Sequence, residues 1–231
     1  MRMIIDAHGQ YFPDQETFAE LARQVNHDMR SPLTAICTYA ECLAWLTTLD
    51  METREKYAKA IIAEARRLGR MGSYFASLAA PPPDGELEEI VLGEVVDEAL
   101  EELRDLLELH EVAVVREADE APLPLIWSRP VLRQIMLAAI ETQTEWAGPK
   151  ARLSLSTAVE GESVLLNVVA ASERPASFDT TRFGYRSARA LLQSHGGKMT
   201  LVAEEGLLCL QVPYIGRMRL ASSEDLLEGS A

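Results

Sequence analysis

The segment FAELARQVNHDMRSPLTAICTYAECL, residues 18–43, decides how this chain folds. Its apolar residues recur at steps of three and four, which is the spacing of one face of an α-helix. A second stripe of this kind runs from Tyr57 to Leu78, after a turn at 47–50 in which Asp50 can cap the following helix. The sequence therefore predicts two long helices joined by a tight turn.

An isolated hairpin of these two helices cannot fully bury both apolar stripes. Two hairpins packed as a four-helix bundle would bury them, so we expect a homodimer. The alternative is that the stripes pack on the second half of the same chain. We favour the dimer, because the stretch APPPDG at 80–85 is proline-rich and polar and predicts an extended linker.

His27 lies off the apolar stripe. It is two residues from both Val25 and Met29, about 200° around the helix from each, so it is expected to face solvent. Pro32 removes a backbone donor and leaves the carbonyl of Asp28 without its helical partner. An exposed imidazole beside a carboxylate and a mid-helix proline departs from the rules of a stable helix, and such departures favour a functional site.

The same segment resembles the H-box helix of two-component sensor histidine kinases, with the pattern F-x-x-x-x-S-H-E-[LM]-R-[TS]-P-L-x-x-I-x-x-Y-x-x-x-L. The residues that match it are His27, Met29, Arg30, Ser31, Pro32, Leu33, Ile36, Tyr39 and Leu43, and Asp28 replaces the commoner glutamate. The resemblance implies that His27 is the phosphoacceptor and that Asp28 orients its ring or takes its proton. It also implies that Ser31, on the same helix face, positions a dephosphorylating water.

The resemblance further implies a partner. Met29, Arg30 and Pro32, which surround the histidine, are expected to dock the receiver domain of a response regulator. The segment from Glu64 to Leu78 also resembles the second helix of the family's dimerisation and phosphotransfer hairpin.

Periodicity in the second half predicts a mixed α+β arrangement, in which helices pack against one face of a sheet. The expected helices are 91–109, 129–145 and 181–195, and the expected strands are 111–117, 123–127, 151–159, 163–170, 198–204 and 207–213. This order resembles the ATP-binding α/β sandwich of histidine kinases. The segment 132–135 is similar to the start of that family's N-box helix, and 194–199 is similar to the turn after its last glycine box.

The nucleotide ligands of that family are missing from the matching positions. Alanine or another side chain stands where the family has asparagine, aspartate or glycine: Ala138 and Thr142 in the N-box, Ala170, Ser172 and Arg174 in the D-x-G-x-G box, and Arg182 in the G-x-G box, of which Gly184 is kept. Alanine offers no oxygen to Mg²⁺, and side chains in place of glycine fill the space of the phosphates. We therefore expect no bound nucleotide, metal or other cofactor.

Length and charge limit the function further. The chain has 231 residues, 22 basic against 36 acidic side chains and a net charge of −14, which argues against nucleic acid as a partner. No stretch is apolar enough to span a membrane, no signal peptide is evident, and three cysteines without metal spacing favour a cytoplasmic setting. The expected parts are a helical hairpin at 1–80, a linker at 81–90, a degenerate ATPase-like domain at 91–216 and an acidic tail at 217–231.

These observations together favour a histidine phosphotransfer protein of a phosphorelay. It would relay phosphoryl groups between receiver aspartates through His27, without ATP-dependent autokinase activity. One alternative is a non-catalytic scaffold that binds a response regulator or a kinase. A second alternative is an active sensor-type kinase that binds ATP in an unconventional way.

Overall fold

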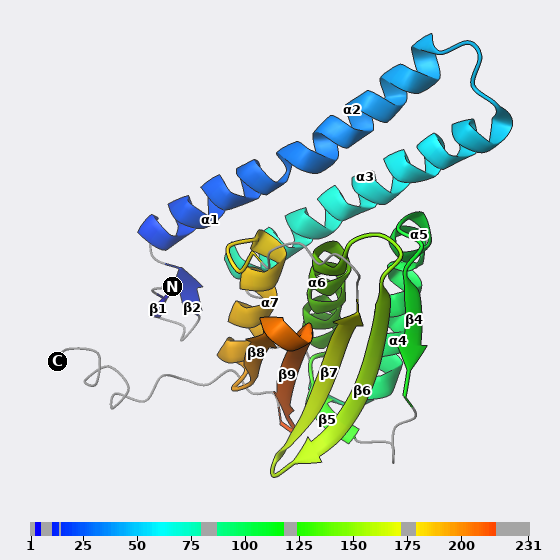
Figure 1. Ribbon diagram of the computed structural model, residues 1–231. Helices are drawn as coiled ribbons and strands as arrows, with labels where there is room; N and C mark the ends of the chain where they lie inside the picture. Colours follow the sequence, from blue (N-terminus) through cyan, green and yellow to red (C-terminus); the bar gives the residue numbers. More distant parts are fainter. Residues whose placement is uncertain are drawn as a thin grey trace.

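The computed structural model describes residues 3–5, 11–13, 15–79, 87–117, 124–171 and 179–215. Its first part is a helical hairpin, in which two helices in line lie antiparallel to a third (Figure 1). These helices are α1 (Gln15–Asp28), α2 (Arg30–Trp45) and α3 (Met51–Ala79). Ahead of them, β1 (Met3–Ile5) and β2 (Tyr11–Pro13) form an antiparallel pair that the sequence did not predict.

The interruption between α1 and α2 lies at Met29, two residues after His27. Helical hydrogen bonds continue on both sides of it, because Met29 N donates to Val25 O at 2.9 Å and Leu33 N donates to Met29 O at 3.2 Å. Pro32 has no N–H to offer the carbonyl of Asp28, so the regular ladder is broken there. The sequence predicted the lost partner of the Asp28 carbonyl but one continuous helix, and the structure divides that helix at Met29, one turn before the proline.

The predicted cap of the second long helix is also confirmed. Thr53 N donates to Asp50 Oδ1 at 2.6 Å, which satisfies one of the free donors at the start of α3. The same hydrogen bond holds the pKa of Asp50 below its ordinary value.

The second part of the chain is an α/β domain, and its element order agrees with the prediction. The elements are β3 (Glu88–Val91), α4 (Leu92–Glu102), α5 (Arg104–Leu109), β4 (Ala113–Arg116), β5 (Pro124–Trp127), α6 (Arg129–Ala147), β6 (Arg152–Glu160), β7 (Ser163–Ala171), α7 (Phe183–Ser194), β8 (Lys198–Val202), the 3₁₀ turn η1 (Ala203–Glu205) and β9 (Leu207–Pro213). Five strands form a mixed sheet in the order β4-β6-β7-β9-β8, in which β4 and β6 are parallel and the other pairs antiparallel.

One strand corrects the expected linker. The stretch 81–90 was predicted to be an extended linker, but its residues from Glu88 onward form the strand β3, which pairs antiparallel with β5 and places Ile90 opposite Leu125. Both of these side chains are buried, so apolar burial fixes this strand beside the domain. The proline-rich residues 80–86 and the acidic tail lie outside the described residues.

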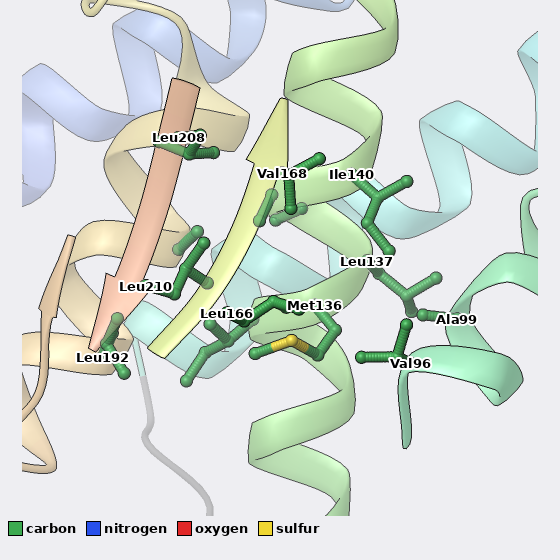
Figure 2. Close-up of a cluster of buried hydrophobic side chains, with 14 of the residues drawn as sticks. Val96, Ala99, Met136, Leu137, Ile140, Leu166, Val168, Leu192, Leu208 and Leu210 are labelled. Carbon is green, nitrogen blue, oxygen red and sulfur yellow. The ribbon is translucent and has the colours of Figure 1, made fainter. Parts of the chain in front are cut away.

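The core of the α/β domain lies between the sheet and helices α4, α6 and α7. Along β7, Val164, Leu166 and Val168 alternate with less buried neighbours, so one face of the sheet is apolar. Figure 2 shows Leu166 and Val168 facing Met136 and Ile140 of α6.

The helical hairpin packs on the α/β domain of the same chain. The sequence analysis considered this arrangement but favoured a hairpin that packs only in a dimer, because the linker is proline-rich and polar. Helix α3 contacts α5 and α7, and Met71 and Tyr74 on α3 are buried in the same apolar cluster as the domain core. The alternative of packing within one chain is thus realised over the C-terminal part of α3. Toward the other end of the hairpin, large apolar side chains are exposed: Leu33, Trp45, Leu46, Met51 and Ile62.

Gly206 allows a tight turn between η1 and β9, and its replacement is expected to destabilise the fold. Its φ is +63°, and an added Cβ would lie 2.3 Å from Ala170 O and 3.0 Å from the ring of Trp146. We expect Gly206→Ala to lower the free energy of unfolding by about 2 kcal/mol or more. The matched control is Gly161→Ala, with φ +58° but no atom near the added Cβ. Equal losses in urea unfolding would contradict the steric explanation.

Candidate functional site

The predicted phosphoacceptor, His27, is exposed and paired with the next residue. Its side chain is 77% exposed, and its Nδ1 lies 3.0 Å from Asp28 Oδ1. The prediction that it faces solvent is confirmed. Because Nδ1 faces a carboxylate, the neutral ring carries its proton there and leaves the Nε2 lone pair free.

Asp28 is held in place by two further hydrogen bonds. Gln24 Nε2 donates to Oδ1 at 2.9 Å, and the backbone N–H of Phe183 donates to Oδ2 at 2.8 Å. Phe183 is the first residue of α7, so the carboxylate of the hairpin caps a helix of the α/β domain. This side chain therefore orients the imidazole and also ties the two parts of the chain together.

A polar cleft of about 320 Å³ lies beside this pair. His27, Asp28 and Ser31 line one side of it, so the structure brings the three predicted catalytic residues together. The other side is formed by α3, α6 and the segment before α7, with Thr142 and Arg182 among its residues. The roles of the three residues stay predictions.

The residues expected to dock a receiver differ in their exposure. Arg30 is exposed, but Met29 is partly buried against the apolar cluster and Pro32 is buried. The prediction of a surface made of all three is corrected accordingly, because Met29 and Pro32 face the interior at the helix break. Arg30 is the member of this set that is free to contact a partner.

The positions of the missing nucleotide ligands are filled or engaged. Ala138 is buried, and the hydroxyl of Thr142 donates to its carbonyl at 2.6 Å. Ala170 N donates to Gly206 O at 2.9 Å, and a Cβ on Gly184 would lie 3.2 Å from Thr142 Oγ1, so α6 and α7 approach closely here. Ser172 and Arg174 lie outside the described residues.

A network of arginine and glutamate side chains, which the sequence analysis missed, connects α3 to α6. Arg70 binds Glu141 in a bidentate manner, with Nη2 to Oε1 at 2.6 Å and Nε to Oε2 at 3.2 Å. Arg67 and Arg182 both pair with Glu145, and Arg67 Nε lies 3.9 Å from Glu141 Oε1. We call these five residues the arginine–glutamate network.

Burial makes this network sensitive to the loss of one partner. Arg70 and Glu141 are each 7% exposed. Burial alone would lower the pKa of Arg70, but the hydrogen bonds and charge of Glu141 outweigh it and raise that pKa. Burial raises the pKa of Tyr74, whose hydroxyl donates to Glu141 Oε2 at 3.5 Å, so this phenol stays neutral. The sequence signal was two glutamates four residues apart, Glu141 and Glu145, directly after the apolar run 135–140 of this helix.

The residues that the structure describes include neither a metal-binding cluster nor a membrane-spanning helix. No group of three or more His, Cys, Asp or Glu side chains in this part of the chain is arranged to hold a metal ion. None of the helices described combines the length and apolarity needed to cross a bilayer.

Residues 19–79, the three helices of the hairpin, match the family of the His Kinase A (phospho-acceptor) domain. The hairpin is therefore similar to a histidine kinase phospho-acceptor domain. Among curated proteins, the sensor protein KdpD of Escherichia coli (strain K12) is 24% identical over 215 residues, which cover 83% of this chain. The match takes in 24% of KdpD, so the chain spans about a quarter of that relative's length.

Solved structures similar to this chain include histidine kinases. The Acinetobacter baumannii histidine kinase AdeS aligns with a TM-score of 0.57 at 14% identity, over 81% of this chain and 98% of that chain. Histidine kinase ThkA in complex with the response regulator protein TrrA aligns at 0.57 and 18% identity, over 94% and 75%. These likenesses show that the chain has the fold of a histidine kinase hairpin followed by its catalytic domain.

Proposed function

We propose that this protein is a histidine phosphotransfer component of a phosphorelay. Nε2 of neutral His27 attacks the phosphorus of an aspartyl phosphate on a receiver domain. The Nε2–P bond forms while the aspartyl O–P bond breaks, and the aspartate leaves as a carboxylate. The ring keeps its proton on Nδ1, where Asp28 stabilises the positive charge that develops. Transfer to a second receiver reverses these bond changes.

The observation that carries the proposal is the contrast between His27 and its surroundings. The imidazole is exposed and oriented by Asp28. The neighbouring region, where a kinase of this family would hold ATP, contains Ala138 and Ala170 and is crossed by the arginine–glutamate network. Mg²⁺ requires oxygen ligands that the two alanines lack.

The outer side of His27 offers a surface for the receiver. An open groove there is lined by Ala22, Arg23, Asn26, His27 and Arg30. Two arginines beside the imidazole suit an acidic phosphoacceptor site, because they can pair with its carboxylates and with the phosphoryl oxygens. The ThkA structure, which contains a response regulator, is consistent with a partner of this class.

We also propose that the hairpin dimerises through its exposed apolar side chains. Leu33 is 47% exposed on α2, and Ile62 is 47% exposed on α3. We expect Leu33→Glu to shift the protein from dimer to monomer in analytical ultracentrifugation, because a charge in an apolar interface is costly. Thr38→Glu, an exposed position on another side of the same helix, is the control. A wild-type monomer, or a dimer that tolerates Leu33→Glu, would contradict the proposal.

The proposal is tested with a panel of receiver domains phosphorylated with labelled phosphate. We expect at least one of them to label this protein with a bond that is stable in alkali and labile in acid, as a phosphoramidate is. A receiver that binds in gel filtration but never transfers its label would favour the scaffold alternative instead.

A further inference from the structure

The cleft beside His27 contains an arginine that the proposed relay does not yet use. Arg182 lines the cleft together with His27, directly before the first residue of α7. It stands at the first glycine position of the G-x-G box, so no side chain of this kind is expected there from the family pattern. Its side chain is 48% exposed, which leaves it free to move.

The charge balance of the network permits Arg182 to leave its present partner. Arg182 Nη1 pairs with Glu145, whose carboxylate also pairs with Arg67 Nη2. Arg67 is only 16% exposed and is held from a second side by Glu141. When Arg182 turns away, Glu145 still pairs with Arg67. The movement therefore does not leave the Glu145 carboxylate as an unpaired buried charge.

Phosphorylation of His27 would create a strong reason for that movement. Nδ1 is engaged by Asp28, so the phosphoryl group is placed on Nε2 of a side chain that borders the cleft. Such a group adds close to two negative charges and three acceptor oxygens. Asp179 and Glu145 also line the cleft, and their carboxylates would repel the group unless a cation intervenes.

The geometry points to Arg182 as the residue that binds the phosphoryl group on His27. Its guanidinium leaves Glu145 and donates hydrogen bonds to two phosphoryl oxygens, as planar guanidinium groups do with phosphate. Glu145 stays paired with Arg67. The α/β domain would thereby stabilise the phosphorylated state of the hairpin instead of supplying ATP. This inference rests on the proposed phosphotransfer function and assigns the residue that holds its intermediate.

The test loads His27 without any receiver, so that its outcome is separate from that of the proposed function. Phosphoramidate transfers its phosphoryl group to the imidazole Nε2; the new N–P bond forms as the reagent's P–N bond breaks, and ammonia leaves. The His27→Gln variant identifies the ³¹P resonance that belongs to this site. The pKa of the phosphoryl group is then measured by ³¹P NMR titration in the full chain.

A nearby guanidinium favours the dianion, so the phosphoryl pKa in the wild type should be low. We expect Arg182→Gln to raise it by about half to one unit and Arg182→Lys to restore part of the shift. Arg186→Gln is the matched control, because Arg186 lies one turn further along α7 and pairs with Glu20 at 3.1 Å. Urea unfolding of each variant checks that the fold is intact.

Three results would overturn the inference: an unchanged pKa in Arg182→Gln, an equal shift in Arg186→Gln, or no phosphoryl resonance assignable to His27. A receiver that fails to load His27, while phosphoramidate gives the expected shift, would contradict the proposed relay and leave the binding role of Arg182 supported.

Discussion

The variant His27→Gln should lose phosphoryl transfer to background with every receiver that labels the wild type. Glutamine keeps the length and polarity of the side chain, but its amide nitrogen has no free lone pair to attack phosphorus. The side chain is 77% exposed, so the substitution removes few contacts and the unfolding free energy should change by less than about 0.5 kcal/mol. The measurement is transfer of label from a phosphorylated receiver at matched protein concentrations.

A second variant separates chemistry from the attachment of the two parts of the chain. Glu20→Gln removes the ion pair between α1 and Arg186 but leaves His27 and Asp28 untouched. We expect its transfer rate to stay close to that of the wild type.

Residual label on another residue in His27→Gln would show that the phosphoacceptor had been misassigned. We expect His27→Gln to keep its binding to the receiver, because Arg23 and Arg30 still line the groove.

Removing Arg70 should have the largest effect on stability. In Arg70→Ala the carboxylate of Glu141 would lose its bidentate partner in a buried position, which is expected to cost about 3–5 kcal/mol. The measurement is urea or thermal unfolding, followed by a signal from the buried Trp127 of the α/β domain.

The double variant Arg70→Met with Glu141→Met is the matched control. It replaces both charges by apolar side chains of similar size, and such replacements of buried ion pairs are often neutral or stabilising. We expect it to recover most of the stability that Arg70→Ala loses. A loss of less than about 1 kcal/mol in Arg70→Ala would contradict the view that this pair is a main tie between hairpin and domain.

Local sequence signals predicted most of the secondary structure. The stripe of apolar residues gave the long helices, Asp50 marked the start of α3, and periodicity in the second half gave the expected strands of the sheet. These signals depend on neighbours in the sequence, and so they can be read without the fold. The strand β3 was missed because four residues with two glutamates carry no clear alternation, and its position depends on pairing with β5.

The candidate site was predictable only on the hairpin side. His27, Asp28 and Ser31 fall within one short segment whose pattern is specific, and the structure places them at one cleft. The bond from Phe183 to Asp28 joins residues 155 positions apart, and no local pattern indicates it. The arginine–glutamate network likewise depends on the approach of α3 to α6, which the proline-rich stretch at 80–85 led us to discount.

One measurement tests the central claim most directly: the source of the phosphoryl group on His27. The purified protein is incubated in parallel with Mg²⁺ and γ-labelled ATP, and with a receiver carrying labelled aspartyl phosphate. Mass spectrometry under alkaline conditions locates the modified residue. We expect phosphohistidine at His27 from the receiver and no incorporation from ATP above that of His27→Gln. Label on His27 from ATP, at a rate comparable with transfer from the receiver, would contradict the account.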